Sequence, residues 1–199
     1  MSASPKIIPI GKLLRAENSR FVAGCRVKEL ETPALGSLVK VKLEDQSEIY
    51  GLITHILIND DNLVRQLVSG VSIPSEYTAD NRYNRNLPVE IHVLTVGYAQ
   101  NGQIAHRLPP RPPLSLDQLF LCDDADVRQF TRQHGYLRHI LHLQDQPIEE
   151  LLAAHFAQVK PLQTAEWYKT ACEKVITLLR GDYAQLTKVL DVLSELETE

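Results

Sequence analysis

The residue types best suited to binding another molecule gather in one polar segment, residues 59–87. Tyr77, Arg82, Tyr83 and Arg85 lie close together there. Tyrosine and arginine are enriched at the hot spots of protein interfaces. A segment of this length without clear structure is usually either a functional loop or disordered. We therefore expect residues 59–87 to form a flap that contacts a protein partner; the alternative is a solvated flap whose tyrosines pack on the neighbouring structure.

Two further arginines give this flap a second interpretation. Arg107 and Arg111 lie beside and within a proline-rich run. If the flap folds next to that run, they form a basic strip with Arg82 and Arg85. Small β-barrels bind single-stranded nucleic acid with such strips and with stacking aromatic side chains. A formal net charge of −4 weakens this interpretation, because nucleic-acid surfaces usually need an excess of lysine and arginine.

Three histidines invite comparison with a metal site. His134, His139 and His142 fall within one predicted helix, and the last two share a helix face. A zinc site needs three or four converging ligands at firm spacing. Neither an HExxH pattern nor a cysteine pair accompanies these histidines. We therefore expect surface or packing histidines and no metal.

The sequence carries no recognisable motif for catalysis. None of its glycines fits the phosphate-binding pattern G-x-x-x-x-G-K-[ST]: Gly11-Lys12 is followed by Leu13, and Lys6 stands where the first glycine belongs. Without that loop there is no backbone cradle for phosphates and no hydroxyl for Mg²⁺. A G-x-S-x-G nucleophile elbow is also missing. We expect a protein that is not an enzyme and has no cofactor; an unrecognised enzyme is the least favoured hypothesis.

Composition indicates an ordinary globular protein. The chain has 199 residues, of which 44% are hydrophobic and 23% charged, enough for one large or two small domains. Cys25, Cys122 and Cys172 are far apart and form no CxxC pair, which favours reduced thiols. No leader-like apolar region opens the chain, and no run approaches the roughly 18 apolar residues of a membrane span. The expectation is a cytoplasmic protein.

Short β-branched runs between turn residues predict a closed sheet over residues 21–122. In the clearest run, residues 36–43, Val39 and Val41 alternate with lysines, so that one face is apolar and the other wet. Asn101-Gly102 marks a hairpin. The other predicted strands are residues 21–27, 48–58, 88–98 and 103–108. The prolines of residues 109–113 suit a rigid strap, with a ligand for an SH3-like groove as the alternative.

One or two helical turns are possible over residues 60–68, and helical periodicity dominates from residue 123 onward. Asp123 or Asp124 caps a helix to about residue 142 that Gly135 splits, and Thr164 caps a later one. Two more helices are predicted over residues 148–159 and from residue 183 onward. We expect the last two helices to form a hairpin packed on the barrel or on a partner. The predicted class is α+β: an arm (1–20), a small closed N-terminal β-barrel (21–122) and a C-terminal α-helical domain (123–199).

Four stretches in this order resemble the HAS-barrel, the N-terminal barrel shared by HerA-type DNA translocases and rotary ATP synthase subunits. They are residues 36–41 (GSLVKV), 49–53 (IYGLI), 93–98 (VLTVGY) and 107–113 (RLPPRPP). In the motor proteins this barrel assembles rings and contacts partners, and a catalytic domain follows. Here helices follow instead, and no Walker residues are present to receive the catalytic roles.

The resemblance therefore implies a stand-alone scaffold without the ATPase motor. The function expected from the sequence is a non-catalytic adaptor that binds other proteins through the flap and the C-terminal helices. A nucleic-acid-binding barrel is the alternative, and assembly with copies of itself is left open.

Overall fold

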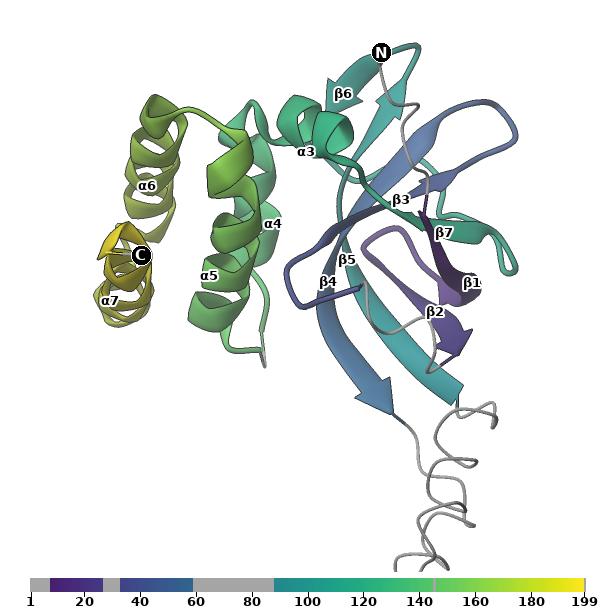
Figure 1. Ribbon diagram of the computed structural model, residues 1–199, viewed down its shortest axis with the longest axis horizontal. Coiled ribbons are helices and arrows are strands. Elements are labelled where there is room, and N and C mark those ends of the chain that lie inside the picture. The colour runs from purple at the N-terminus through teal and green to yellow at the C-terminus, as the bar shows by residue number, and fades with distance from the viewer. Residues whose placement is uncertain (1–7, 27–32, 59–87, 145, 199) are drawn as a thin grey trace, which may run out of the picture.

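The computed structural model describes residues 8–26, 33–58, 88–144 and 146–198, which form an antiparallel β-barrel with helices beside it (Figure 1). The predicted α+β class is confirmed. The strands are β1 (Ile8–Ala16), β2 (Arg20–Arg26), β3 (Leu38–Lys42), β4 (Glu48–Ile58), β5 (Pro88–Gln100), β6 (Gln103–Ala105) and β7 (Gln118–Leu121). The helices are α3 (Asp124–Thr131), η2 (His134–Tyr136), α4 (Leu137–Leu141), α5 (Ile148–Val159), η3 (Lys160–Leu162), α6 (Ala165–Leu179) and α7 (Tyr183–Thr198).

The barrel closes because the strands at the two ends of the six-strand order, β2 and β5, also pair with each other. The strand order is β2-β1-β7-β3-β4-β5, and β5 pairs back with β2, while β6 extends β5 as a hairpin. The predicted Asn-Gly turn joins β5 to β6, with φ of 52° at Asn101 and 76° at Gly102. Two consecutive left-handed residues match the twist of a hairpin, which explains the Asn-Gly pair.

The barrel begins earlier than the sequence predicted. The assignment of residues 1–20 to an arm is wrong for residues 8–16, which form β1 and pair with both β2 and β7. The register shifts between Pro9 and Gly11 and again between Leu13 and Arg15. Such bulges interrupt the alternation of apolar and polar residues by which a strand is recognised. The predicted flap, residues 59–87, lies outside the described residues.

Two apolar cores lie on the two faces of the barrel wall. The inner core fills the barrel with side chains that include Leu13, Phe21, Val39 and Ile91. The second core lies between the outer face of β3, β4 and β5 and the helices. Lys40 was expected on a wet face, but it is buried because this outer face is covered. The predicted alternation of apolar and polar residues is confirmed, but the prediction that the polar face meets solvent is wrong at Lys40.

The helices stack in layers away from the barrel. The helix predicted from residue 123 is split near Gly135 into α3, η2 and α4, and Thr164 accepts a hydrogen bond from the backbone N–H of Trp167 as the predicted cap. In Figure 1, α4 and α5 stand next to the barrel, and α6 and α7 lie beyond them. The final hairpin therefore packs on α4 and α5 rather than on the barrel itself.

Candidate functional site

The structure places two of the sequence-predicted binding residues. Arg107 and Arg111 are exposed in the connection between β6 and β7. Arg107 donates from Nε and Nη2 to the Tyr98 hydroxyl, at 3.1 and 2.9 Å. Hydrogen bonds from Ser47, together with the charge of Arg111, lower the pKa of the Asp45 carboxyl in the turn between β3 and β4. The Arg107 side chain is thus held by a hydrogen-bonded contact to Tyr98 on β5, while Arg111 lies near the turn between β3 and β4.

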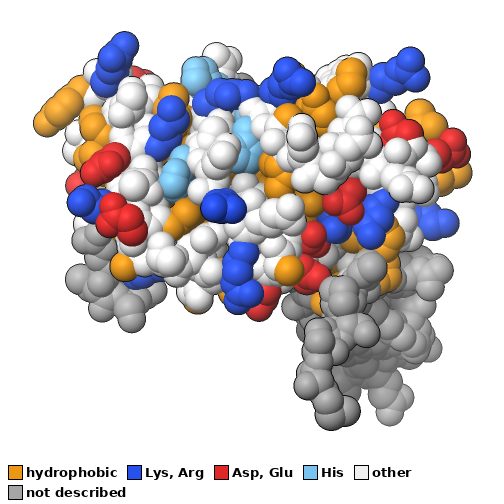
Figure 2. Space-filling model, turned by 90° about the horizontal axis from the view of Figure 1, so that it is seen from above, with side chains coloured by type: hydrophobic (Ala, Val, Ile, Leu, Met, Phe, Trp, Pro, Cys, Tyr) orange, Lys and Arg blue, Asp and Glu red, His pale blue; other side chains and the backbone are white. Residues whose placement is uncertain are grey.

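The other four predicted residues, Tyr77, Arg82, Tyr83 and Arg85, lie outside the described residues. The basic strip therefore stays a prediction. Figure 2 shows lysine and arginine side chains scattered over the face seen from above, with acidic side chains also present on it.

A turn before β7 carries exposed leucines that the sequence analysis missed. Leu114 is 66% exposed and Leu116 is 72% exposed. The backbone N–H of Leu116 donates to Leu13 O at 2.8 Å, and Ser115 Oγ donates to Leu14 O at 3.3 Å, so the turn lies against the β1 bulge. The bulged residue, Leu14, is itself 49% exposed. We call Leu14, Leu114 and Leu116 the leucine patch.

The backbone of this turn is strained. Leu116 has a φ of 73°, in the left-handed region where a Cβ atom crowds the following carbonyl. Asp117 Oδ2 accepts from the Leu114 N–H at 2.8 Å and the Asp117 N–H donates to Leu114 O at 3.2 Å, so the turn is closed from both sides. The chain thus holds a bulky apolar side chain in solvent in a conformation that glycine would adopt more easily.

A cleft of about 460 Å³ opens elsewhere on the barrel's outer face. Across four neighbouring strands Arg15 pairs with Val22, Val22 with His92, and His92 with His55. Residues paired in this way point to the same face, so these four side chains form one row along the cleft floor. Leu143 and Gln146, from the connection between α4 and α5, line the opposite wall. No local pattern in the sequence marks this row, because it exists only through the register of four strands.

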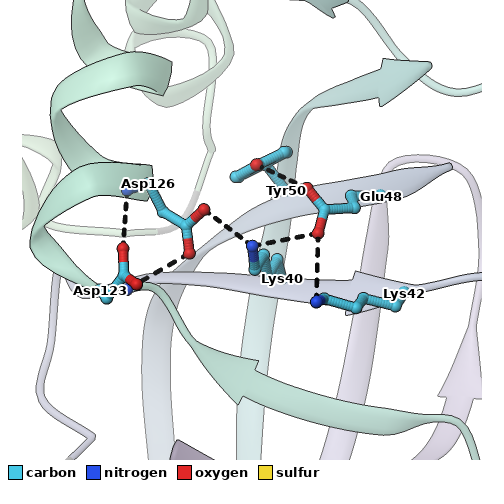
Figure 3. Close-up of polar contacts among 6 residues, drawn as sticks. All are labelled: Lys40, Lys42, Glu48, Tyr50, Asp123 and Asp126. Carbon is cyan, nitrogen blue, oxygen red and sulfur yellow. Dashed lines mark hydrogen bonds and ion pairs between the residues drawn. The ribbon is translucent and has the colours of Figure 1, made fainter. Parts of the chain in front are cut away.

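An ion network joins the barrel to α3 (Figure 3). Lys40 Nζ lies 2.7 Å from Asp126 Oδ1 and 3.0 Å from Glu48 Oε1, and the Lys40 side chain is only 9% exposed. Asp126 and Asp123 form a capping box at the start of α3. Burial alone lowers the pKa of Lys40, but the hydrogen bonds from its ammonium to Asp126 and Glu48 raise it overall. A protonated amine held between two carboxylates is a structural ion pair and not a nucleophile.

The remaining titratable groups at this junction are also poorly suited to catalysis. Burial raises the pKa of the Cys122 thiol and of the Tyr50 hydroxyl, which donates to Glu48 at 2.9 Å. Both groups therefore stay protonated at neutral pH. In the described part of the chain, no group of three or more His, Cys, Asp or Glu side chains is placed to hold a metal ion. None of the helices there is long and apolar enough to cross a membrane.

Comparisons with known proteins do not assign the chain to a family. No model of a protein family matches the sequence, and a search of curated proteins finds no relative.

Proposed function

We propose that this chain is a non-catalytic assembly or adaptor module that binds another protein through the leucine patch. The observation that carries the proposal is the exposure of Leu14, Leu114 and Leu116 on two adjoining segments of the barrel. Single exposed leucines are common on protein surfaces. Larger exposed apolar patches mark contact sites, and we propose that these three leucines form one. The resemblance to the HAS-barrel, which in motor proteins contacts partners, is in keeping with this role.

The strain at Leu116 supports a role for its side chain. A left-handed leucine costs about 1–2 kcal/mol relative to an ordinary backbone conformation, and at 72% exposure the side chain recovers little of that by burial. Backbone strain of this kind is concentrated at ligand and partner sites. The turn therefore lowers folding stability while it holds an apolar side chain in solvent. A partner that buries this side chain would offset the loss.

The charges around the leucine patch indicate the chemistry of the partner. Lys12 and Arg15 flank Leu14 along β1, and Arg111 precedes Leu114 in the chain; all three are exposed. Of these three, Arg15 is paired with Glu90, which leaves Lys12 and Arg111 as cations at the rim. Complementary charges at an interface rim favour the encounter of the correct partner. We therefore expect a protein surface that is apolar at its centre and acidic at its edge.

The test is site-specific photocrosslinking followed by reconstitution. A photoreactive phenylalanine analogue replaces Leu116 in one variant and Tyr183, an exposed residue of α7, in a control. The proposal expects a crosslinked protein from position 116 that is not obtained from position 183. The purified partner should then bind L114S/L116S at least about tenfold more weakly than the unaltered chain, as is usual for hot-spot residues.

Equal affinity of that partner for L114S/L116S and the unaltered chain contradicts the proposal. So does a crosslink from position 116 that joins only nucleic acid.

A further inference from the structure

We propose that the cleft between the barrel and the helices is a binding site for a small organic anion, with an apolar body and one carboxylate or phosphate group. This inference goes beyond the proposed function and does not depend on it. A volume of about 460 Å³ lies within the range of small-molecule sites, which combine apolar walls with a few converging polar groups.

The apolar part of the ligand has a defined place. Val22 and Leu94 come from the outer face of β2 and β5, and Leu143 closes the opposite side from the helical region. The two imidazoles of His55 and His92 meet edge to face, with ring centroids 5.7 Å apart, and extend this floor. Burial lowers the pKa of His92, so its ring is neutral at physiological pH. A flat or branched hydrocarbon group fits such a surface better than a polar one.

The anionic group is assigned by the arginines. Arg15 Nη2 already donates to Glu90 Oε2 at 3.0 Å, so its charge is largely balanced. Arg20 lies at the rim of the same cleft and is exposed, and its guanidinium forms no hydrogen bond or ion pair with the described residues. A guanidinium group presents a fork of donors that matches a carboxylate or phosphate. Among the described residues that line the cleft, Arg20 is therefore the cation available to a ligand.

Among the described residues that line the cleft, one is acidic; its charge opposes this assignment and provides a test. Glu17 also lines the cleft, and its Oε1 accepts from Ser19 Oγ at 2.5 Å. Its charge repels an anion bound in the same cleft, because like charges disfavour each other at short separations. Removal of the charge at position 17 and of the charge at position 20 should therefore change affinity in opposite directions, which a purely apolar cleft does not require.

The probe is 8-anilinonaphthalene-1-sulfonate, an aromatic body with one anionic group, followed by fluorescence titration of the full chain. We expect one saturable site, binding about tenfold weaker in R20A because a charge-assisted contact is lost, and tighter binding in E17Q. The matched control R180A removes an exposed arginine at the C-terminal end of α6 and should leave the affinity unchanged. Arg20 and Glu17 are both exposed, so neither change should affect folding.

Competition experiments show whether binding needs the negative charge or only the shape of the ligand. They also show whether a carboxylate or a phosphate is preferred. Benzoate and phenyl phosphate should displace the probe, and the stronger competitor identifies the preferred group, whereas benzyl alcohol should not. Unchanged affinity in R20A, or equal competition by benzyl alcohol, overturns the proposal. Loss of binding in L114S/L116S also overturns it, because the probe then occupies the leucine patch and not the cleft.

Discussion

The Tyr136 hydroxyl donates a hydrogen bond to His155 Nε2 at 3.0 Å, with both side chains fully buried. On its other side, His155 Nδ1 lies 2.8 Å from Gly36 O. A carbonyl only accepts, so the imidazole proton is on Nδ1 and Nε2 is the acceptor. This chain of two bonds runs from the helical region to the segment before β3, and it holds the helices against the barrel at one point.

The first prediction removes one donor from that chain. Y136F leaves His155 Nε2 buried without a partner, which should lower the free energy of unfolding by about 1–2 kcal/mol. Urea unfolding at neutral pH measures the change. Y183F is the matched control, because Tyr183 is 81% exposed and should tolerate the loss of its hydroxyl. Equal stability of Y136F and the unaltered chain shows that the bond contributes nothing.

Stability should also fall in mild acid. Burial lowers the pKa of His155 from 6.5 to about 4. The unfolded chain takes up a proton on His155 as pH drops through 6.5, but the folded chain does not until about pH 4. The stabilisation from His155 is therefore complete above pH 6.5 and is lost as pH falls toward 4. Linkage gives a loss of about 3 kcal/mol from this residue. Burial lowers the pKa of His92, His106, His134 and His139 as well, so they act in the same direction.

Urea unfolding in a series of buffers between pH 7.5 and 4.5 measures this loss. H155Q should be less stable at pH 7.5 and show a shallower dependence on pH than the unaltered chain. A pH dependence that is identical in H155Q and the unaltered chain contradicts the assignment to His155.

Two nearby lysines on β3 allow a buried ion pair to be compared with an exposed one. Lys40 is 9% exposed and sits between Asp126 and Glu48, while Lys42 is 46% exposed and lies 3.8 Å from the same Glu48. K40M removes the buried cation from between two carboxylates and leaves Asp126 without its ion pair, which should cost about 2–4 kcal/mol of unfolding free energy. K42M should change it by less than about 0.5 kcal/mol. Similar effects of the two substitutions would falsify the ion-network description.

Substitutions at two left-handed glycines allow the cost of backbone strain to be distinguished from the cost of a steric clash. Gly36 and Gly102 have φ of 77° and 76°. A Cβ at Gly36 meets His155 N at 2.6 Å, whereas a Cβ at Gly102 meets nothing within 4 Å. G102A should cost about 1 kcal/mol from backbone strain alone. G36A should cost about 1–3 kcal/mol more, because the helix α5 must move away. Thermal unfolding of both variants checks the difference; equal midpoints contradict the close approach of α5 to Gly36.

The strained turn gives a prediction in which stability and binding move in opposite directions. L116G relaxes the left-handed backbone and should raise the free energy of unfolding by about 0.5–1 kcal/mol. The same change removes the most exposed leucine of the patch and should weaken capture of the proposed partner. Parallel measurements of unfolding and binding test this. A destabilised L116G indicates that the leucine packs to advantage in the free protein, which contradicts the proposed role.

The sequence was most informative where structure is local. The hairpin between β3 and β4, the Asn101-Gly102 turn and the Thr164 cap each follow from a few adjacent residues, and all three are present. The strand β1 was missed because its bulge at Leu14 breaks the two-residue period. The buried position of Lys40 depends on α3, which follows more than eighty residues later, since Asp126 lies 86 positions away.

The candidate sites were harder to predict for the same reason. Arg15, Val22, His92 and His55 share a row only after four strands have taken their register, and no spacing in the sequence records that. The leucine patch had a weak signal, because Leu114 and Leu116 alternate with polar residues after the prolines. Their exposure follows from a single left-handed residue, and nothing in the sequence indicates that a leucine takes that conformation.

The core shared between barrel and helices limits how this fold can be divided. Leu38, Leu52, Leu94 and Val96 belong to the barrel wall, yet their neighbours in the core are Phe130, Leu137, Phe156 and other helical side chains. A chain cut between β7 and α3 would expose that apolar wall to water. The two parts should therefore melt in one cooperative transition. Any recombination at this boundary must therefore also supply a new cover for the outer face of the barrel.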